Sequence, residues 1–182
     1  NLVTWYFGIP SSSSHALIGG LIGAVLIGGG FHAIISKGLI KIFIALFFSP
    51  VVGLLVGWLT IKLTYRFLRK ASPKANYFFK LGQIPTAMAL ALSHGSNDAQ
   101  KTMGIIALGL VLTGHQQHFT IPFWVIIISA GAIGLGTIFG GWRIIRTLGT
   151  KFYKIKPIHS FTSQLASATV IITASLFGGP VS

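Results

Sequence analysis

The sequence contains no cysteine and a single acidic residue, Asp98. The lack of cysteine excludes disulfide frameworks, thiolate metal sites and cysteine nucleophiles. A lone carboxylate excludes catalysis by a pair of acids. The sequence also lacks a G-x-x-x-x-G-K-[ST] phosphate loop and a Ser-His-Asp order with a nucleophile elbow. We therefore predict that the protein is not an enzyme and needs no cofactor.

Charge of either sign is scarce, since charged residues make up 8% of the 182 residues and hydrophobic residues 52%. The mean hydropathy is +0.79. A soluble domain has about a quarter of its residues charged, so this chain has too few polar side chains to cover a surface in water. A bilayer removes that difficulty, because apolar side chains then face lipid. We predict an all-α, polytopic protein of the cell (inner or plasma) membrane.

The charge that is present is almost all positive, with 14 Lys and Arg and a formal net charge of +13. Such a balance is also typical of nucleic-acid binding. Here, however, all the basic residues except Lys37, Lys41 and Lys101 fall in two clusters between apolar runs. This pattern is typical of cytoplasmic loops that face anionic lipid, so we predict lipid contacts and no nucleic-acid partner. The clusters are Lys62, Arg66, Arg69, Lys70, Lys74 and Lys80, then Arg143, Arg146, Lys151, Lys154 and Lys156.

Two apolar runs, 42–61 and 123–141, are long enough to cross a membrane, the first with a kink predicted at Pro50. Three other runs are interrupted by polar or Gly-Pro segments. Interrupted apolar segments in corresponding places indicate the binding site of a transporter. We therefore predict a broken helix over 81–112 and re-entrant hairpins within 1–30 and 161–182.

An F-G-x-P-x-S pattern occurs twice, from Phe7 to Ser12 and from Phe177 to Ser182. If the first copy forms a re-entrant hairpin, three crossings separate the two copies, and the second hairpin enters from the opposite side. This parity predicts an inverted repeat, divided into 1–30 (end of the first repeat), 31–80 (span and basic cytoplasmic loop) and 81–182 (second repeat). A complete crossing by 16–35 would break the inversion. Both ends fall inside a repeat, so we expect the chain to continue on each side.

Asp98 is the residue from which we expect ion chemistry, because a carboxylate at mid-membrane is costly. One interpretation is a site for sodium or a proton, assisted by Asn97 and by carbonyls freed at Gly95. The alternative is an ion pair with Lys101, one helical turn away. Sodium and proton coupling both stay open, and the oxygen-rich surroundings favour sodium.

Four serines, Ser11 to Ser14, immediately precede an apolar helix. Capping that helix needs one of them. The others favour an anion site, because a helix N-terminus offers free N–H groups. Phosphate and sulfate fit these features equally. His15 and His94 lie beside two of the breaks and are candidates for anion contact or proton transfer.

Together these motifs resemble the inorganic phosphate transporter (PiT) family. Gly8-Ile9-Pro10-Ser11-Ser12-Ser13-Ser14-His15 is similar to its P-x-S-[ST]-[ST]-H signature, and Gly95-Ser96-Asn97-Asp98 to its G-[AS]-N-D motif. Gly179-Pro180-Val181-Ser182 is similar to the start of a second hairpin signature.

The resemblance implies a homodimeric carrier that moves phosphate together with sodium or protons by alternating access. The competing interpretations are an anion channel, a carrier of another oxyanion such as sulfate, and a phosphate sensor that transports nothing. By resemblance, the phosphate-binding residues are Ser11, Ser12, Ser13, Ser14, His15, Gly95, Ser96, Asn97 and Lys101. The sodium ligands implied in the same way are Asn97, Asp98, Gln100, Gln164 and Ser182.

Overall fold

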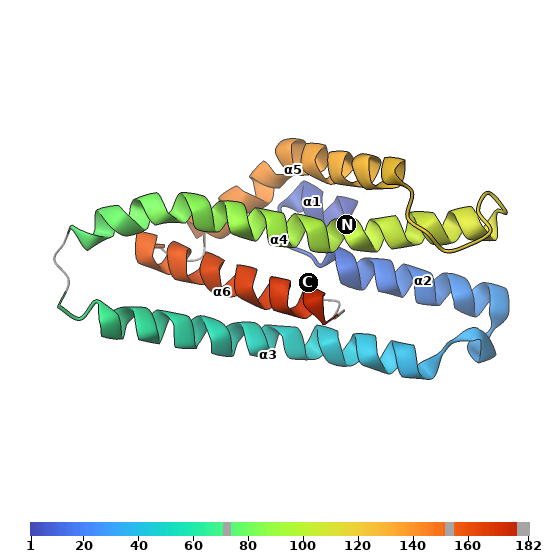
Figure 1. Ribbon diagram of the computed structural model, residues 1–182, viewed down its shortest axis with the longest axis horizontal. Coiled ribbons are helices and arrows are strands. Elements are labelled where there is room, and N and C mark those ends of the chain that lie inside the picture. Colours follow the sequence, from blue (N-terminus) through green and yellow to red (C-terminus); the bar gives the residue numbers. More distant parts are fainter. Residues whose placement is uncertain (71–73, 152–154, 178–182) are drawn as a thin grey trace.

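A computed structural model describes residues 1–70, 74–151 and 155–177, and within these ranges the chain is helical with no strand. This confirms the predicted all-α class. The helices shown in Figure 1 are α1 (Leu2–Phe7), α2 (Ser13–Gly29), the 3-10 turn η1 (Phe31–Ala33), α3 (Ser36–Phe67), α4 (Ala75–Leu112), α5 (Phe123–Lys151) and α6 (Pro157–Leu176).

The long helices α3 and α4 run in opposite directions along the molecule (Figure 1), and α6 packs against both of them. Helix α5 packs on α4. The approach of α6 to α4 depends on a small residue, because a Cβ atom added to Gly82 would lie 3.0 Å from the ring of Phe161. The rings of Phe161 and Phe79 meet edge to face with centroids 5.3 Å apart. Small residues allow such close helix contact where water does not drive packing.

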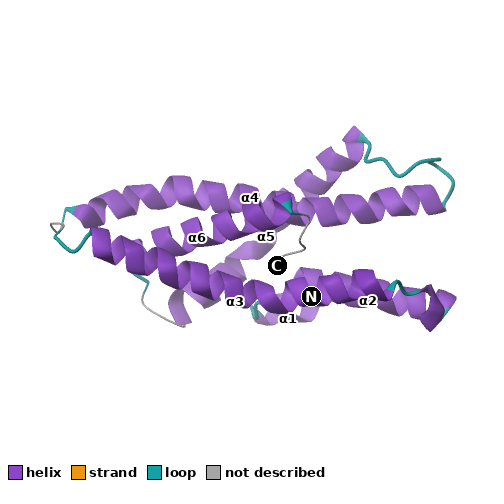
Figure 2. Ribbon diagram, turned by 60° about the horizontal axis from the view of Figure 1, so that its bottom comes forward, coloured by secondary structure: helices purple, strands orange, loops and turns teal. Residues whose placement is uncertain are grey.

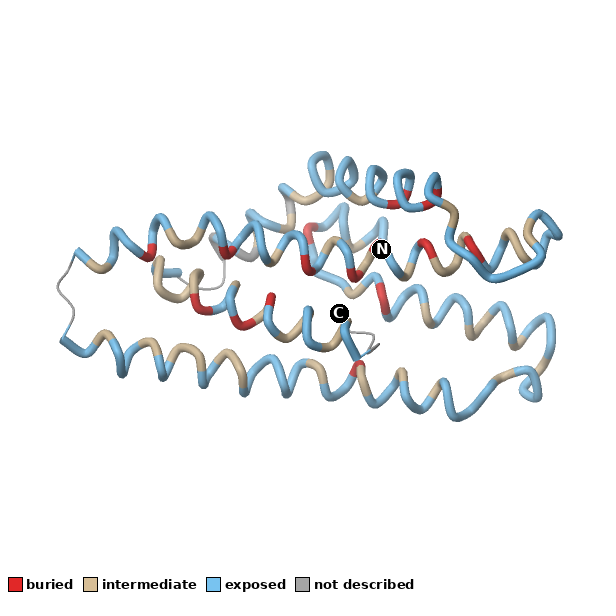
Figure 3. Tube along the Cα trace, viewed as in Figure 1, coloured by how far each residue is buried: buried red, intermediate tan, exposed pale blue. Residues whose placement is uncertain are grey.

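The buried core is small and the exterior is apolar. Ala99 and Met103 of α4 pack with Val125 of α5, beside the partly buried Ile106, Leu110 and Ile133. Along α3, in contrast, large apolar side chains such as Phe47 and Leu54 are more than two-thirds exposed, at 72% and 73% (Figure 3). Such a surface is unfavourable in water and suits the hydrocarbon core of a bilayer.

Among the described residues, two helical segments are long and apolar enough to cross a membrane, Ser36–Phe67 and Phe123–Trp142. They contain the two uninterrupted spans predicted from sequence. Pro50 lies inside α3 and has no N–H with which to reach the carbonyl of Leu46. The hydroxyl of Ser49 donates to that carbonyl over 3.1 Å, so the freed acceptor is satisfied within the helix.

The prediction of a broken helix over 81–112 is wrong, because α4 is continuous from Ala75 to Leu112. The polar residues that suggested a break are accommodated inside the helix. Ser93 and Ser96 donate to the carbonyls of Ala89 and Leu92, each over 2.6 Å. Gly95 is not among the residues with positive φ, so the backbone there keeps ordinary helical geometry. Serine hydroxyls commonly satisfy themselves in this way inside helices.

Helix α2 ends at Gly29, and Gly30 follows with φ of 70°. Its 17 residues extend about 26 Å, so residues 16–35 do not form one long spanning helix. Figures 1 and 2 both place the start of α2 and the end of α6 near the middle of the long helices, with the two helices extending from there toward opposite ends. Two re-entrant arms of an inverted repeat would lie in this way. The inversion itself stays a prediction, and the second hairpin tip, 178–182, lies outside the described residues.

The end of α3, which carries part of the first basic cluster, lies beside the start of α6, which follows the second cluster. The hydroxyl of Tyr65, among the basic residues that end α3, is 3.1 Å from Nε2 of His159 at the start of α6. Lys37 lies at the start of α3, and the 32 residues of that helix extend about 48 Å. The ends of α3 are therefore far enough apart to lie on opposite sides of a membrane.

This orientation can be tested with single cysteines at Lys37 and Lys70, introduced into a cysteine-free form of the intact protein. Because α3 is expected to cross the bilayer, an impermeant thiol reagent should label the two positions from opposite faces of sealed vesicles. Labelling of both cysteines from the same face would show that α3 does not cross.

Candidate functional site

The loop before α2 is organised by its serines, which have different partners. Ser12 is the N-cap, and its hydroxyl accepts from the backbone N–H of His15 over 3.3 Å. The same hydroxyl lies 2.6 Å from Nδ1 of His15. Ser11 is hydrogen-bonded to the hydroxyl of Thr4 at 2.8 Å. These contacts hold the loop between α1 and α2, and they use His15 as part of the cap.

Ser14 differs from its neighbours because it is 2% exposed and contacts α4. The Nζ atom of Lys101 donates to the Ser14 hydroxyl over 2.7 Å. The same Nζ atom is 3.0 Å from Oδ1 of Asp98, one turn earlier on α4. One ammonium group therefore joins the first turn of α2 to the carboxylate of α4. Hydrogen bonds of this charged kind are shorter and stronger than neutral ones.

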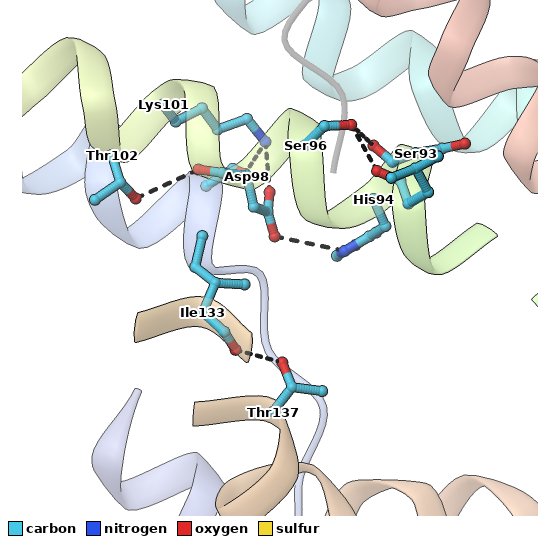
Figure 4. Close-up of polar contacts among 10 residues, drawn as sticks. Ser93, His94, Ser96, Asp98, Lys101, Thr102, Ile133 and Thr137 are labelled. Atoms are coloured by element: carbon cyan, nitrogen blue, oxygen red, sulfur yellow. Dashed lines mark hydrogen bonds and ion pairs between the residues drawn. The ribbon is translucent and has the colours of Figure 1, made fainter. Parts of the chain in front are cut away.

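Figure 4 shows Asp98 between Lys101 and His94 on one side of α4. Oδ2 of Asp98 is 3.6 Å from Nδ1 of His94, whose side chain is 53% exposed. This distance is longer than that of a hydrogen bond, so His94 is a neighbour of Asp98 and not a fixed partner. The ion pair with Lys101, the alternative considered from sequence, is present in the structure.

Two cavities adjoin this contact. The larger, of about 550 Å³, lies among α2, α3, α4 and α6. Its polar lining residues are Ser14, Lys41, Asn97, Gln100, Lys101 and Ser175. The smaller, of about 430 Å³, is lined by polar residues Asn1, Ser13, Ser14, Asp98, Lys101 and Thr102. Ser14 and Lys101 line both cavities, so their hydrogen bond forms part of the wall between them.

The larger cavity gathers several residues that the family motifs indicate, namely Ser14, Asn97, Gln100 and Lys101. It also contains two that the sequence analysis did not single out, Lys41 and Ser175. The sequence analysis left Lys41 outside both basic clusters and assigned it no role. Ser175 lies just before the second F-G-x-P-x-S pattern, and that position was the one available signal. Gly95 and Ser96 line neither cavity, and the Ser96 hydroxyl is turned to its own helix.

The sodium ligands implied by resemblance are not gathered at one point. Oε1 of Gln164 accepts from the Thr86 hydroxyl over 2.7 Å. Thr86 lies about 18 Å from Asp98 along the continuous α4, so Gln164 does not share an ion with Asp98 in this conformation. Asn97 lines the larger cavity and Asp98 the smaller one. Ser182 lies outside the described residues, and among those described no group of three His, Cys, Asp or Glu could hold a metal ion.

Comparison with known proteins identifies the family of the chain. The family model described as "Phosphate transporter family" matches residues 1–182. The chain belongs to this family. It is 45% identical to a probable low-affinity inorganic phosphate transporter of Rhizobium meliloti and 43% identical to one of Bacillus subtilis, covering 100% of this chain and 55% of each relative. The corresponding protein of Mycobacterium leprae is 44% identical over 98% of this chain and 44% of its own length.

Family membership confirms the predicted resemblance. It indicates a membrane protein that belongs to a transporter family and is not an enzyme. The chain spans about half the length of these curated relatives. No solved structure matches it significantly.

From the contact between Ser14 and Lys101 we predict that loss of the Ser14 hydroxyl lowers the stability of the protein. Replacing Ser14 by Ala removes the buried acceptor of a charged donor, which costs about 1.5–3 kcal/mol. We expect the thermal unfolding midpoint of the detergent-solubilised intact protein to fall. Ser11→Ala is the matched control, because Ser11 is exposed, and it should change stability by less than about 0.5 kcal/mol. Equal midpoints for both variants would contradict a structural role for the Ser14 contact.

Proposed function

We propose that the protein is a secondary active transporter that moves inorganic phosphate across the cell membrane together with sodium or protons. The observation that carries this proposal is the larger cavity, where two lysines and several hydrogen-bonding side chains gather within mainly apolar walls. The curated relatives are named as inorganic phosphate transporters, which supports phosphate as the oxyanion.

The donors in this cavity suit a tetrahedral oxyanion. Lys41 and Lys101 supply positive charge, and the amides of Asn97 and Gln100 and the hydroxyls of Ser14 and Ser175 supply hydrogen bonds. Charged donors to an oxyanion form the strongest hydrogen bonds available to a protein. The start of α2 adds backbone N–H groups near Ser13 and Ser14. Sulfate has the same shape, so discrimination between the two anions is part of the test.

The cation is proposed to act at Asp98. The smaller cavity is lined by Ser13, Thr102 and Asn1 together with Asp98, and sodium prefers oxygen ligands such as these residues carry. His94, 3.6 Å from Asp98, offers a proton acceptor instead. Both cations therefore stay in the proposal, and the gradient experiment below decides between them.

Alternating access is proposed from the course of α2 and α6. Helix α2 begins near the middle of the bundle and α6 ends there. From the middle, the two helices extend toward opposite ends of the bundle (Figure 1). Two such arms, moving in turn, would open a central site first to one side and then to the other. The remaining part of the site would come from the region of the intact protein that corresponds to the rest of its relatives' length. A homodimer, implied by the family resemblance, also stays a proposal.

Uptake of ³²P-labelled phosphate into vesicles containing the intact protein tests this function. We expect an inward sodium or proton gradient to raise the initial rate at least about tenfold over vesicles with no gradient, because the cation supplies the driving force. Unlabelled phosphate should compete better than unlabelled sulfate. Flux that ignores both gradients would favour an anion channel, and phosphate binding without flux would favour a sensor.

Asp98→Asn tests the residue proposed to hold the cation. Loss of the carboxylate should lower gradient-driven uptake by at least about tenfold, or roughly 1.4 kcal/mol, while exchange of phosphate for phosphate is reduced less. Comparing the two rates in the same vesicles separates lost coupling from poor folding. Full gradient-driven uptake by the variant would assign Asp98 a structural role as the ion-pair partner of Lys101.

A further inference from the structure

The two cavities differ in the charge of the residues that line them. Among the described residues, the larger cavity has Lys41 and Lys101 and no acid, whereas the smaller one has the sequence's single acid, Asp98. An anion is therefore favoured in the larger cavity, and the smaller cavity is the one that offers a carboxylate to a cation. Lys101 belongs to both, and its Nζ atom is placed between the hydroxyl of Ser14 and the carboxylate of Asp98.

We propose that Lys101 couples phosphate to its co-transported cation by changing its ion-pair partner. Its ammonium leaves the Asp98 carboxylate and pairs with the phosphate anion. This inference rests on the proposed symport and identifies the group that links its two ligands. Without phosphate, Lys101 neutralises Asp98, and a second cation gains little from binding there. When phosphate occupies the larger cavity, its oxygens compete for the same ammonium, and Nζ moves away from Asp98.

The exchange leaves a partly buried carboxylate, with a side chain 24% exposed, without its lysine. A carboxylate that loses its partner inside a protein is destabilised, so Asp98 then attracts sodium or a proton. Occupation of the larger cavity thereby favours occupation of the smaller one. By thermodynamic reciprocity, the cation at Asp98 releases Lys101 and favours phosphate to the same degree.

The chemistry of lysine suits this exchange. Its ammonium is a compact charge with three donors on a flexible four-carbon stem, so it can turn between acceptors without moving its helix. Ser14, which lines both cavities and is buried, offers Nζ a neutral acceptor in the position between them. Lys41 lines the larger cavity but not the smaller one, so it can attract phosphate without acting on Asp98.

The test measures cation affinity with and without saturating phosphate in the purified intact protein, using ²²Na⁺ if sodium drives uptake or a pH-indicating dye if protons do. In the wild type we expect phosphate to tighten cation binding at least about fivefold. In Lys101→Gln we expect a change below about twofold, together with tighter cation binding than wild type when phosphate is absent. Lys41→Gln removes the same charge from the same cavity. It should weaken phosphate binding but keep the wild-type ratio of cation affinity with phosphate to cation affinity without it.

The proposal would be overturned if phosphate tightened cation binding by the Lys101→Gln variant as much as it does in the wild type. Should this variant fail to fold, infrared difference spectra of the wild type decide the question, because addition of phosphate should shift a carboxylate band that is missing in Asp98→Asn. An unchanged band would also overturn it. A wild-type protein whose uptake ignores both cations would instead overturn the symport on which this inference rests.

Discussion

The contact of Lys101 with Ser14 and Asp98 is the interaction on which the centre of the molecule depends. Helix α6 packs on both α3 and α4, and α5 packs on α4, but α2 packs mainly against its own following turn. The ammonium of Lys101 therefore does much to hold the buried start of α2 at α4. The same group neutralises a carboxylate that would otherwise be costly inside an apolar bundle. One positive charge thus fixes a helix end and stabilises the single acid.

The rest of the architecture positions this contact at mid-length. Helix α6, which packs on α4, contributes Ser175 to one wall of the larger cavity, and α3 contributes Lys41 to another. Polar groups that would be orphaned in lipid are satisfied locally, as Ser49 does for the carbonyl freed by Pro50. An apolar exterior with a polar interior seam is the inverse of a soluble domain. Among the described residues, Lys41, Asp98 and Lys101 are the charged side chains that line the two central cavities.

Sequence reasoning failed where it equated polar residues with a broken helix. Ser93, Gly95 and Ser96 are compatible with either a break or a continuous helix, since serine hydroxyls can bond to carbonyls one turn back. Packing against α5 and α6 selects the continuous form, and no local pattern encodes that packing. The same continuity separates Gln164 from Asp98, because residues on a straight helix keep their axial spacing.

The sequence by itself determined the helical class, the membrane environment, the two clean spans and the family, because composition, run length and motif identity are local properties. It also marked Ser14, Asn97, Asp98 and Lys101 as candidate residues of the binding site. The tertiary structure alone decided that Lys41 and Ser175 join them, that Ser12 caps while Ser14 is buried, and that Lys101 is shared by two cavities. These outcomes depend on which faces of separate helices meet, and helix packing fixes that through contacts between residues distant in sequence.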